Sequence, residues 1–274
     1  MISLQNISKS FGNQTVLKNI NLTVDAGETL ALLGLSGSGK TTLLRLINQL
    51  EKPDSGTILI ENQPIQHQNI LTLRRKMGYV IQQGGLFPHY SVLENIGVVP
   101  RLLGWSNAAI KERAEELLLK LHLDPSTYLY KMPHQLSGGQ QQRIGIARAL
   151  AANPPVLLMD EPFGALDPIT RTDIRHEFLH LDELKEKTII MVTHDVQEAF
   201  EMGDKIALLR KGELLKHDTP LALLEDHESN FLSDFIGTER LVLMLKEKGL
   251  YELLNHKEQQ NKLNWAQLQS WIND

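Results

Sequence analysis

The chain has 274 residues, of which 42% are hydrophobic and 22% charged, a composition typical of a folded protein of one or two domains and not of a disordered or fibrous chain. Its 28 basic and 33 acidic side chains give a net charge of −5, which argues against a dedicated nucleic-acid-binding protein because such proteins carry a basic excess. It contains no cysteine, which excludes disulfides, thiolate nucleophiles and cysteine zinc sites and agrees with a reducing compartment.

Neither export nor membrane insertion is indicated by the sequence. The first residues are polar and lack the basic start and apolar core of a signal peptide. Apolar runs such as residues 156–159 are much shorter than the roughly 18 residues that indicate a membrane span. We therefore expect any role at a membrane to depend on another protein.

The first sixty residues predict a mixed sheet region that ends in a strand, a loop and a helix. Ile20, Leu22 and Val24 recur with a period of two, and residues 29–33 form a continuous apolar run, both typical of strands. Residues 58–60 form another strand candidate after an Asp-Ser-Gly turn. Between them, residues 41–50 have apolar side chains at helical spacing directly after a glycine-rich loop.

The rest of the chain predicts a helical insert followed by buried parallel strands. Residues 92–150 are expected to be helical, with one amphipathic helix around residues 110–121 and another over residues 140–151. Residues 156–159 and 188–192 are short apolar runs of the kind found in buried parallel strands. Residues 205–209 and 213–216 are separated by a Lys-Gly turn and predict a hairpin. The chain is therefore assigned to the α/β class.

A phosphate-binding loop is predicted between the strand at residues 29–33 and the helix after it. Residues 34–41, Gly-Leu-Ser-Gly-Ser-Gly-Lys-Thr, fit the pattern G-x-x-x-x-G-K-[ST]. Backbone N–H groups of such a loop and the positive end of the helix bind nucleotide phosphates, Lys40 adds a full charge, and the Thr41 hydroxyl is suited to Mg²⁺. The alternative is a plain glycine-rich turn. The candidate binding residues are Gly34, Ser36, Gly37, Ser38, Gly39, Lys40, Thr41 and Thr42.

Two adjacent carboxylates, Asp160 and Glu161, follow the apolar run of residues 156–159. They are expected at the carboxyl edge of a parallel sheet, where ligands bind in open α/β folds. We assign Asp160 to Mg²⁺ and Glu161 to the polarisation of a water that attacks the γ-phosphate. The alternative is an ordinary polar strand end.

A second anion site is predicted at the start of the helix that follows residues 136–140, Leu-Ser-Gly-Gly-Gln. Its serine and glycines occupy a helix N-terminus with free backbone donors. One nucleotide needs one such loop, so two anion sites imply either two nucleotides within one subunit or one nucleotide shared between subunits. The chain has a single G-x-x-x-x-G-K-[ST] loop, which favours sharing. We therefore expect one nucleotide to be shared between two subunits.

The glycine-rich loop, Leu-Ser-Gly-Gly-Gln, Asp160-Glu161, Gly-Ala-Leu-Asp at residues 164–167 and Val-Thr-His-Asp at residues 192–195, in this order, resemble the ATPase subunit of an ABC transporter. The resemblance covers about residues 1–236. It implies a P-loop NTPase (RecA-like) core with an antiparallel β subdomain and an inserted α-helical subdomain over about residues 92–150. It also implies ATP and Mg²⁺ as ligands.

The same resemblance implies roles for single residues. Phe11 is similar to the aromatic residue that stacks on adenine, Gln82 to the glutamine that senses Mg²⁺ and the attacking water, and His194 to the switch histidine at the γ-phosphate. Core packing of Phe11, a structural role for His194, and Gln83 in place of Gln82 are the alternatives. The catalytic candidates are Glu161, His194, Lys40 and Gln82, and the metal candidates are Thr41, Gln82 and Asp160.

The family resemblance further implies a head-to-tail homodimer with two ATP molecules. In such a dimer the Leu-Ser-Gly-Gly-Gln segment of residues 136–140, the signature, contacts ATP on the opposite subunit, and Asp167 helps to link the two sites. The residues concerned are Ser137, Gly138, Gly139, Gln140 and Asp167.

A narrower resemblance points to importers of quaternary amines such as glycine betaine, choline or carnitine. It rests on residues 78–89, 95–100 and 235–240. It implies membrane permease subunits and a solute-binding receptor as partners, no nucleic acid, and a peripheral location on the cytoplasmic face of the bacterial inner (plasma) membrane. We expect a short extension over residues 237–274 in place of the regulatory CBS domains that many members carry. The alternatives are an importer of another solute, such as an amino acid, and a soluble ABC ATPase without a transport role.

Overall fold

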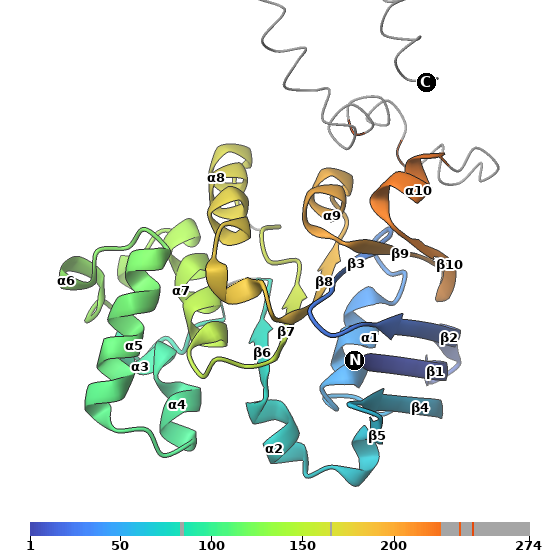
Figure 1. Cartoon of the computed structure of the whole chain (residues 1–274), viewed down its shortest axis with the longest axis horizontal. Coiled ribbons are helices and arrows are strands. Elements are labelled where there is room, and N and C mark those ends of the chain that lie inside the picture. The colour runs from blue at the N-terminus through green and yellow to red at the C-terminus, as the bar shows by residue number, and fades with distance from the viewer. Residues whose placement is uncertain (83–84, 165, 226–235, 237–242, 244–274) are drawn as a thin grey trace, which may run out of the picture.

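Two β-sheets with helices packed on and between them make up the described part of the chain (Figure 1). The computed structural model describes residues 1–82, 85–164 and 166–225, together with Ile236 and Leu243. None of the helices in these ranges combines the length and the apolar character needed to cross a membrane.

The central sheet has six strands in the order β10-β9-β3-β8-β7-β6. All neighbouring pairs are parallel except β9 with β10, which form the predicted hairpin. The three apolar runs predicted as strands are β3, β7 and β8, and all three are buried. The strands are β3 (Thr29–Leu33), β6 (Met77–Val80), β7 (Val156–Asp160), β8 (Thr188–Thr193), β9 (Lys205–Arg210) and β10 (Glu213–Asp218).

The second sheet is antiparallel, in the order β2-β1-β4-β5, and contains the first strands of the chain. The side chains of Ile20, Leu22 and Val24 are all buried on one face, as their period of two predicts. The strands are β1 (Ile2–Phe11), β2 (Gln14–Val24), β4 (Ser55–Ile60) and β5 (Gln63–Pro64).

Helix α1 (Lys40–Ile47) packs between the two sheets. Leu43 and Leu44 are fully buried and share one core with Leu30 and Leu32 of β3. Ala31, which alternates with them along the strand, faces a second core formed with helices on the other side of the sheet. The helix ends earlier than the predicted residue 50, because Asn48 caps it and Gln49 turns into the left-handed region.

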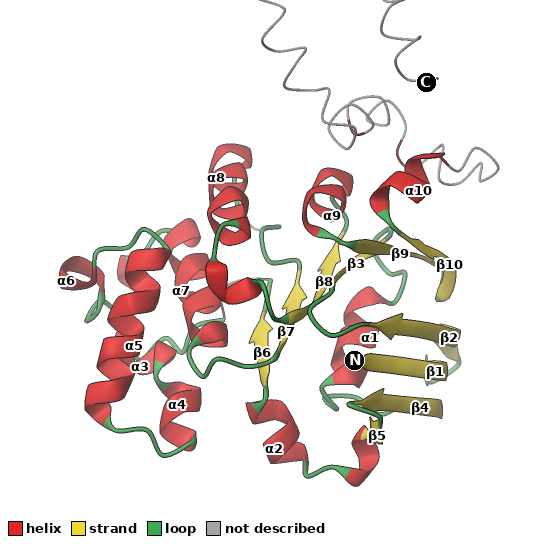
Figure 2. Cartoon of the chain, viewed as in Figure 1, coloured by secondary structure: helices red, strands yellow, loops and turns green. Residues whose placement is uncertain are grey.

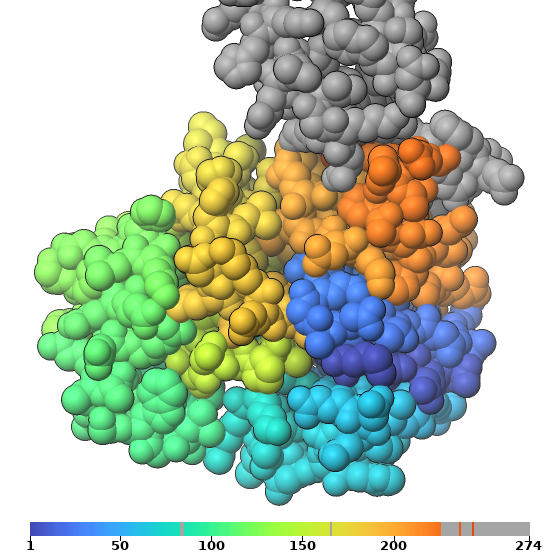
Figure 3. Space-filling view, in the orientation of Figure 1, coloured from blue at the N-terminus to red at the C-terminus, as the bar shows by residue number. Residues whose placement is uncertain are grey.

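The predicted helical insert over residues 92–150 forms the lobe drawn in green in Figures 1 and 3. Its long helix buries the face predicted from Ile110 and Leu117. The helix predicted over residues 140–151 begins earlier, because Ser137 caps its N-terminus and both glycines of the signature lie in its first turn. The insert contains α3 (Val92–Ile96), α4 (Val98–Leu102), α5 (Asn107–Lys120), α6 (Pro125–Tyr128), the 3₁₀ turn η2 (Pro133–Gln135) and α7 (Gly138–Leu150).

Four further helices and two 3₁₀ turns complete the described part of the chain (Figure 2). They are α2 (Ile70–Arg75), α8 (Pro168–Leu179), α9 (Val196–Met202) and α10 (Pro220–Glu225), with the 3₁₀ turns η1 (Ile65–His67) and η3 (Asp182–Leu184). The P-loop NTPase core, the antiparallel sheet and the helical insert of the expected fold are thus all present. The domain boundary expected after residue 236 and the extension expected over residues 237–274 lie outside the described residues. Only Ile236 and Leu243 are described in this part of the chain, and both are buried.

Candidate active site

The carboxyl edge of the central sheet gathers the predicted site residues. Because β3, β6, β7 and β8 are parallel, the segments after their last residues meet at one edge. The glycine-rich loop follows Leu33, Gln82 lies two residues beyond β6, Glu161 follows β7, and His194 follows β8.

The glycine-rich loop depends on close backbone approaches that a side chain would prevent. Gly39 has a φ of 101° and caps helix α1 from the left-handed region. A Cβ atom at Gly39 would lie 2.7 Å from Cδ2 of Leu17, and one at Gly34 would overlap the carbonyl oxygen of Leu209. The loop is therefore held against β2 and β9 in a shape that glycine alone permits.

Lys40 folds back into this loop. Its Nζ atom donates hydrogen bonds to the carbonyl oxygens of Gly34 at 2.7 Å and Leu35 at 3.0 Å. Burial lowers the pKa of the Lys40 ammonium, and the carboxylates of Glu161 and Asp160 oppose that effect. The site thus places a partly desolvated cation where phosphate oxygens would be stronger acceptors than carbonyls.

Thr41 and Asp160 form a pair of oxygen donors that fits Mg²⁺. The Thr41 hydroxyl donates a 2.8 Å hydrogen bond to Oδ1 of Asp160, the last residue of β7. Burial raises the pKa of the Asp160 carboxyl, the Thr41 hydrogen bond lowers it, and the nearby charge of Glu161 raises it further. Mg²⁺ typically binds through one or two protein oxygens together with nucleotide phosphates and water.

Glu161 lies between Gln82 and His194. The Gln82 side-chain amide donates a 2.6 Å hydrogen bond to Oε2 of Glu161, and Oε1 lies 3.3 Å from Nδ1 of His194. Glu161 has a φ of 45°, in the left-handed region that costs a non-glycine residue energy, and its N–H donates to the carbonyl oxygen of Val192. Strained backbone of this kind is concentrated at functional sites. Of the two adjacent glutamines, Gln82 makes this contact, and Gln83 lies outside the described residues.

A cavity of about 260 Å³ opens over the glycine-rich loop. It is lined by residues 36–42, Glu161, Gln14 and Val16. Phe11, at the end of β1, is 46% exposed, with Nζ of Lys9 5.1 Å from its ring centroid. The alternative of Phe11 in the core is therefore wrong, although its ring does not line this cavity. Stacking on adenine stays a prediction.

The signature segment lies apart from that cavity. Ser137 caps helix α7: its hydroxyl accepts from the N–H of Gln140, and the Gln140 side chain accepts from the N–H of Ser137. None of these signature residues lines the cavity over the glycine-rich loop. Helices α1 and α7 also belong to different cores, one on each face of the central sheet. One chain therefore does not bring its two anion sites together.

The two glycines of the signature differ in their surroundings. A Cβ atom at Gly138 would meet nothing within 4 Å, whereas one at Gly139 would lie 2.8 Å from Cγ2 of Thr170 in helix α8. Asp167 caps that helix by accepting from the N–H of Thr170 at 3.1 Å. Gly139 is thus needed for packing between α7 and α8, while Gly138 is free to face a ligand.

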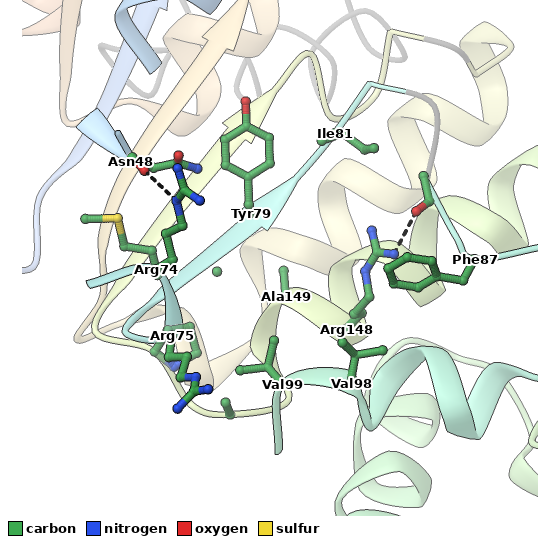
Figure 4. Close-up of a pocket in the computed structure, with 15 residues that line it drawn as sticks. Asn48, Arg74, Arg75, Tyr79, Ile81, Phe87, Val98, Val99, Arg148 and Ala149 are labelled. Carbon is green, nitrogen blue, oxygen red and sulfur yellow. Dashed lines mark hydrogen bonds between the residues drawn. The ribbon is translucent and has the colours of Figure 1, made fainter. Parts of the chain in front are cut away.

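A second cavity, of about 350 Å³, lies between strand β6 and the helical insert (Figure 4). The exposed side chains of Ile81 and Phe87 line it, so it begins one residue from Gln82. Arg148 of α7 donates a 2.7 Å hydrogen bond from Nη1 to the carbonyl oxygen of Gly85 at its wall. Its lining residues are Asn48, Arg74, Arg75, Met77, Gly78, Tyr79, Ile81, Gly85, Phe87, Val98, Val99, Arg148, Ala149, Ala152 and Pro154.

Polar residues next to His194 were not among the residues predicted from the sequence. Arg171 of α8 and Glu198 of α9 contact residues on either side of His194. Glu198 lies three residues after Asp195, a spacing typical of a helix N-terminus, and this spacing alone does not show that its side chain reaches Thr193. The contact of Arg171 with Asp195 depends on the packing of α8 beside β8, which the local sequence does not show.

Comparison with known proteins relates both the sequence and the fold to ATP-binding cassettes. Residues 17–164 match the family model described as ABC transporter. The chain is 49% identical over 88% of its length to the choline transport ATP-binding protein OpuBA of Bacillus subtilis. It is 44% identical over 94% of its length to the glycine betaine uptake system ATP-binding protein YehX of Escherichia coli.

The covered lengths of these relatives differ. The chain spans 64% of OpuBA and 84% of YehX. Among solved structures it resembles a dimeric post-hydrolysis state of the ATP-binding cassette MJ0796 bound to ADP and Pi, with a TM-score of 0.72 and 38% identity over 80% of this chain and 99% of that one.

Proposed function

The chain belongs to the ABC transporter family, and on that premise we propose that it is the ATP-hydrolysing subunit of an importer for a small quaternary-amine osmoprotectant. The observation that carries the proposal is the position of Glu161. Its carboxylate lies between Gln82 and His194 and lines the cavity formed by the phosphate loop. Three side chains from three neighbouring strand ends therefore converge where a γ-phosphate would lie.

The residues of this site have separate roles in phosphoryl transfer. The backbone N–H groups of residues 36–42 and the Lys40 ammonium bind the β- and γ-phosphates. Thr41 and Asp160 would hold Mg²⁺, which neutralises phosphate charge when bound, with Gln82 as the further metal candidate. Glu161 accepts a proton from the attacking water, and Gln82 orients that water. His194 donates a hydrogen bond to the transferred phosphoryl group.

Two copies of the chain are proposed to close around two ATP molecules. Support comes from the separation of the phosphate loop from Ser137 and Gly138, which are exposed at the N-terminus of α7. The donors of that helix end suit the γ-phosphate of a nucleotide bound to the second copy. Asp167 then lies at the same interface, and Phe11 is the candidate platform for adenine.

The cavity between β6 and the helical insert is proposed to receive a helix of a membrane permease subunit. It combines apolar walls, such as Phe87 and Val98, with the guanidinium groups of Arg74, Arg75 and Arg148. No carboxylate is among the residues that line it. The inserted segment is therefore expected to bring both apolar and acidic side chains. Its insertion would move the segment that carries Gln82.

Import of a quaternary amine is proposed from the relatives. OpuBA, YehX and the carnitine, choline and glycine betaine protein OpuCA are all named for such solutes. On this proposal the chain lies at the cytoplasmic face of the bacterial inner membrane with its permease and a solute-binding receptor.

Purification from its native membranes tests this function. The tagged chain should co-purify with permease subunits from detergent-solubilised membranes. After reconstitution in liposomes it should drive ATP-dependent uptake of choline, glycine betaine or carnitine, and Lys40→Ala should abolish that uptake. Uptake of an amino acid alone would favour the alternative importer. A wholly soluble protein without permease subunits would favour an ABC ATPase that has no transport role.

A further inference from the structure

A polar brace joins helix α8, strand β8 and helix α9 directly behind His194. It consists of Arg171, Thr193, Asp195 and Glu198. The Thr193 hydroxyl donates a 2.7 Å hydrogen bond to Oε2 of Glu198 and accepts one of 3.0 Å from the N–H of Asp195. Asp195 in turn accepts from the N–H of Glu198 at 3.1 Å and pairs with Nη1 of Arg171 at 3.3 Å.

The brace fixes the residues immediately before and after His194. The His194 side chain itself is 55% exposed and makes its contact at 3.3 Å with Glu161. Its position is therefore set by the backbone at Thr193 and Asp195 more than by packing around the ring. Both of these residues are held by side chains of the brace.

Arg171 also connects the brace to the loop that carries Asp167. While Nη1 pairs with Asp195, Nη2 donates a 3.1 Å hydrogen bond to the carbonyl oxygen of Leu166. Leu166 immediately precedes Asp167, which caps α8. A single guanidinium thus spans the loop before α8 and the loop that bears His194, a geometry that a lysine ammonium does not reproduce.

Burial makes a purely structural role for these polar groups costly. Glu198 is 2% exposed, and its Oε1 atom has no hydrogen-bond partner among the described residues. The Nε atom of Arg171 is likewise buried without a partner within those residues. Apolar side chains of similar volume would fill such a site at lower cost in free energy.

We infer that Arg171 and Glu198 are positioning residues that hold His194 at the γ-phosphate site and tie its placement to the loop of Asp167. The inference rests on the proposed function, since it assigns His194 to ATP hydrolysis. When a second copy contacts the loop of Asp167, Arg171 passes that contact to Asp195 and therefore to His194.

Two measurements on the full chain test the inference. The first is the kcat and KM of MgATP hydrolysis. The second is the ring NMR signal of His194 in nucleotide-free protein with labelled histidine, assigned with His194→Ala. In Arg171→Met and Glu198→Leu, kcat should fall about tenfold with KM for ATP within about threefold, and the His194 signal should shift.

Matched variants separate positioning from stability. Glu198→Gln keeps the acceptor for Thr193 and should recover most of the activity lost in Glu198→Leu. Arg143 of α7 pairs with Glu177 of α8, both with side chains 18% exposed, and neither contacts the brace. Arg143→Met therefore removes a similar ion pair that also involves α8, the helix of Arg171. It should leave kcat within about twofold and the His194 signal unchanged.

A failure of the positioning role can be told apart from a failure of the proposed function. A wild-type chain that hydrolyses no ATP would refute that function, while the His194 signal would still report on the brace. A folded Arg171→Met protein with wild-type kcat and an unshifted His194 signal would overturn the inference. If Arg171→Met does not fold, Arg171→Lys decides in its place: an unshifted signal and unchanged kcat there would overturn it as well.

Discussion

The Gln82 side-chain amide donates a 2.6 Å hydrogen bond to the carboxylate of Glu161, 79 residues further along the chain. The contact arises because β6 and β7 are parallel neighbours, which brings the segments after them to one edge of the sheet. Gln82 also lies one residue from the cavity proposed to receive the permease. A movement at that cavity can therefore reach the proposed catalytic base through one side chain.

Replacement of the proposed base should separate ATP binding from hydrolysis. Glu161→Gln keeps the shape and the contact with Gln82 but cannot accept the proton of the attacking water. We expect the rate of phosphate release to fall by about 10²–10⁴ with ATP affinity retained. Phosphate release and equilibrium binding of ATP check this. Glu213→Gln, at an exposed surface carboxylate, is the control and should retain wild-type turnover.

Loss of the Thr41 hydroxyl should reduce the effect of Mg²⁺ on nucleotide binding. Thr41→Val deletes the hydrogen-bond donor to Asp160 and one of the protein oxygens suited to the metal. In Mg²⁺ the variant should bind ATP about tenfold more weakly than the wild type, the equivalent of one lost hydrogen bond to a charged group. In EDTA the two proteins should bind ATP equally. Titration calorimetry measures the ATP affinity of both proteins under both conditions. An equal effect of Mg²⁺ on the two proteins would exclude Thr41 as a ligand.

A charge at Gly138 should block closure of the dimer without damage to the fold. The site has open space for a side chain, whereas a substitution at Gly139 would disturb packing against Thr170. In the Glu161→Gln background, ATP should produce dimers in light scattering, and Gly138→Asp should leave monomers that still bind ATP. Asn107→Asp adds the same charge to the first turn of α5 and should still dimerise. Dimers of the Gly138→Asp protein would contradict the shared site.

The buried carboxyl of Glu198 should make stability depend on pH. Burial raises its pKa from 4.5 to about 7, the Thr193 hydrogen bond opposes this, Asp195 adds to it, and Arg175 and Arg171 oppose it. The folded protein therefore binds a proton that the unfolded chain releases near pH 4.5. The free energy of unfolding should fall as pH rises from about 4.5 to 7, by on the order of 3 kcal/mol, and then level off.

Urea denaturation across this pH range measures the effect of Glu198. Glu198→Gln does not titrate, so the stability difference between wild type and variant isolates the contribution of Glu198 from that of Asp160, whose pKa is also raised. A difference that stays constant between pH 4.5 and 7 would show that burial does not raise the pKa of Glu198.

The sequence predicted the site better than its surroundings, for a physical reason. The apolar runs that became β3, β7 and β8 are short and typical of buried strands, and parallel strands bring the residues after them together. Lys40, Glu161 and His194 could therefore be expected in one place without any knowledge of the helices.

Elements with weak local signals were not predicted. Strand β6 has only four residues, one of them glycine, and helix α8 shows its core only in Ile174 and Phe178 among polar neighbours. The brace behind His194 was beyond reach because its hydrogen bonds join residues on three elements whose relative positions depend on tertiary packing. The exposure of Phe11 at the end of β1 was implied by the family resemblance alone, since an aromatic residue beside a turn is more often buried.

A structure of the Glu161→Gln protein with trapped MgATP tests the shared nucleotide site most directly. We predict two copies around two ATP molecules, with Ser137 and Gly138 of one copy at the γ-phosphate that Lys40 of the other copy binds. ATP enclosed entirely by one copy, with the signature segment facing solvent, would contradict the account.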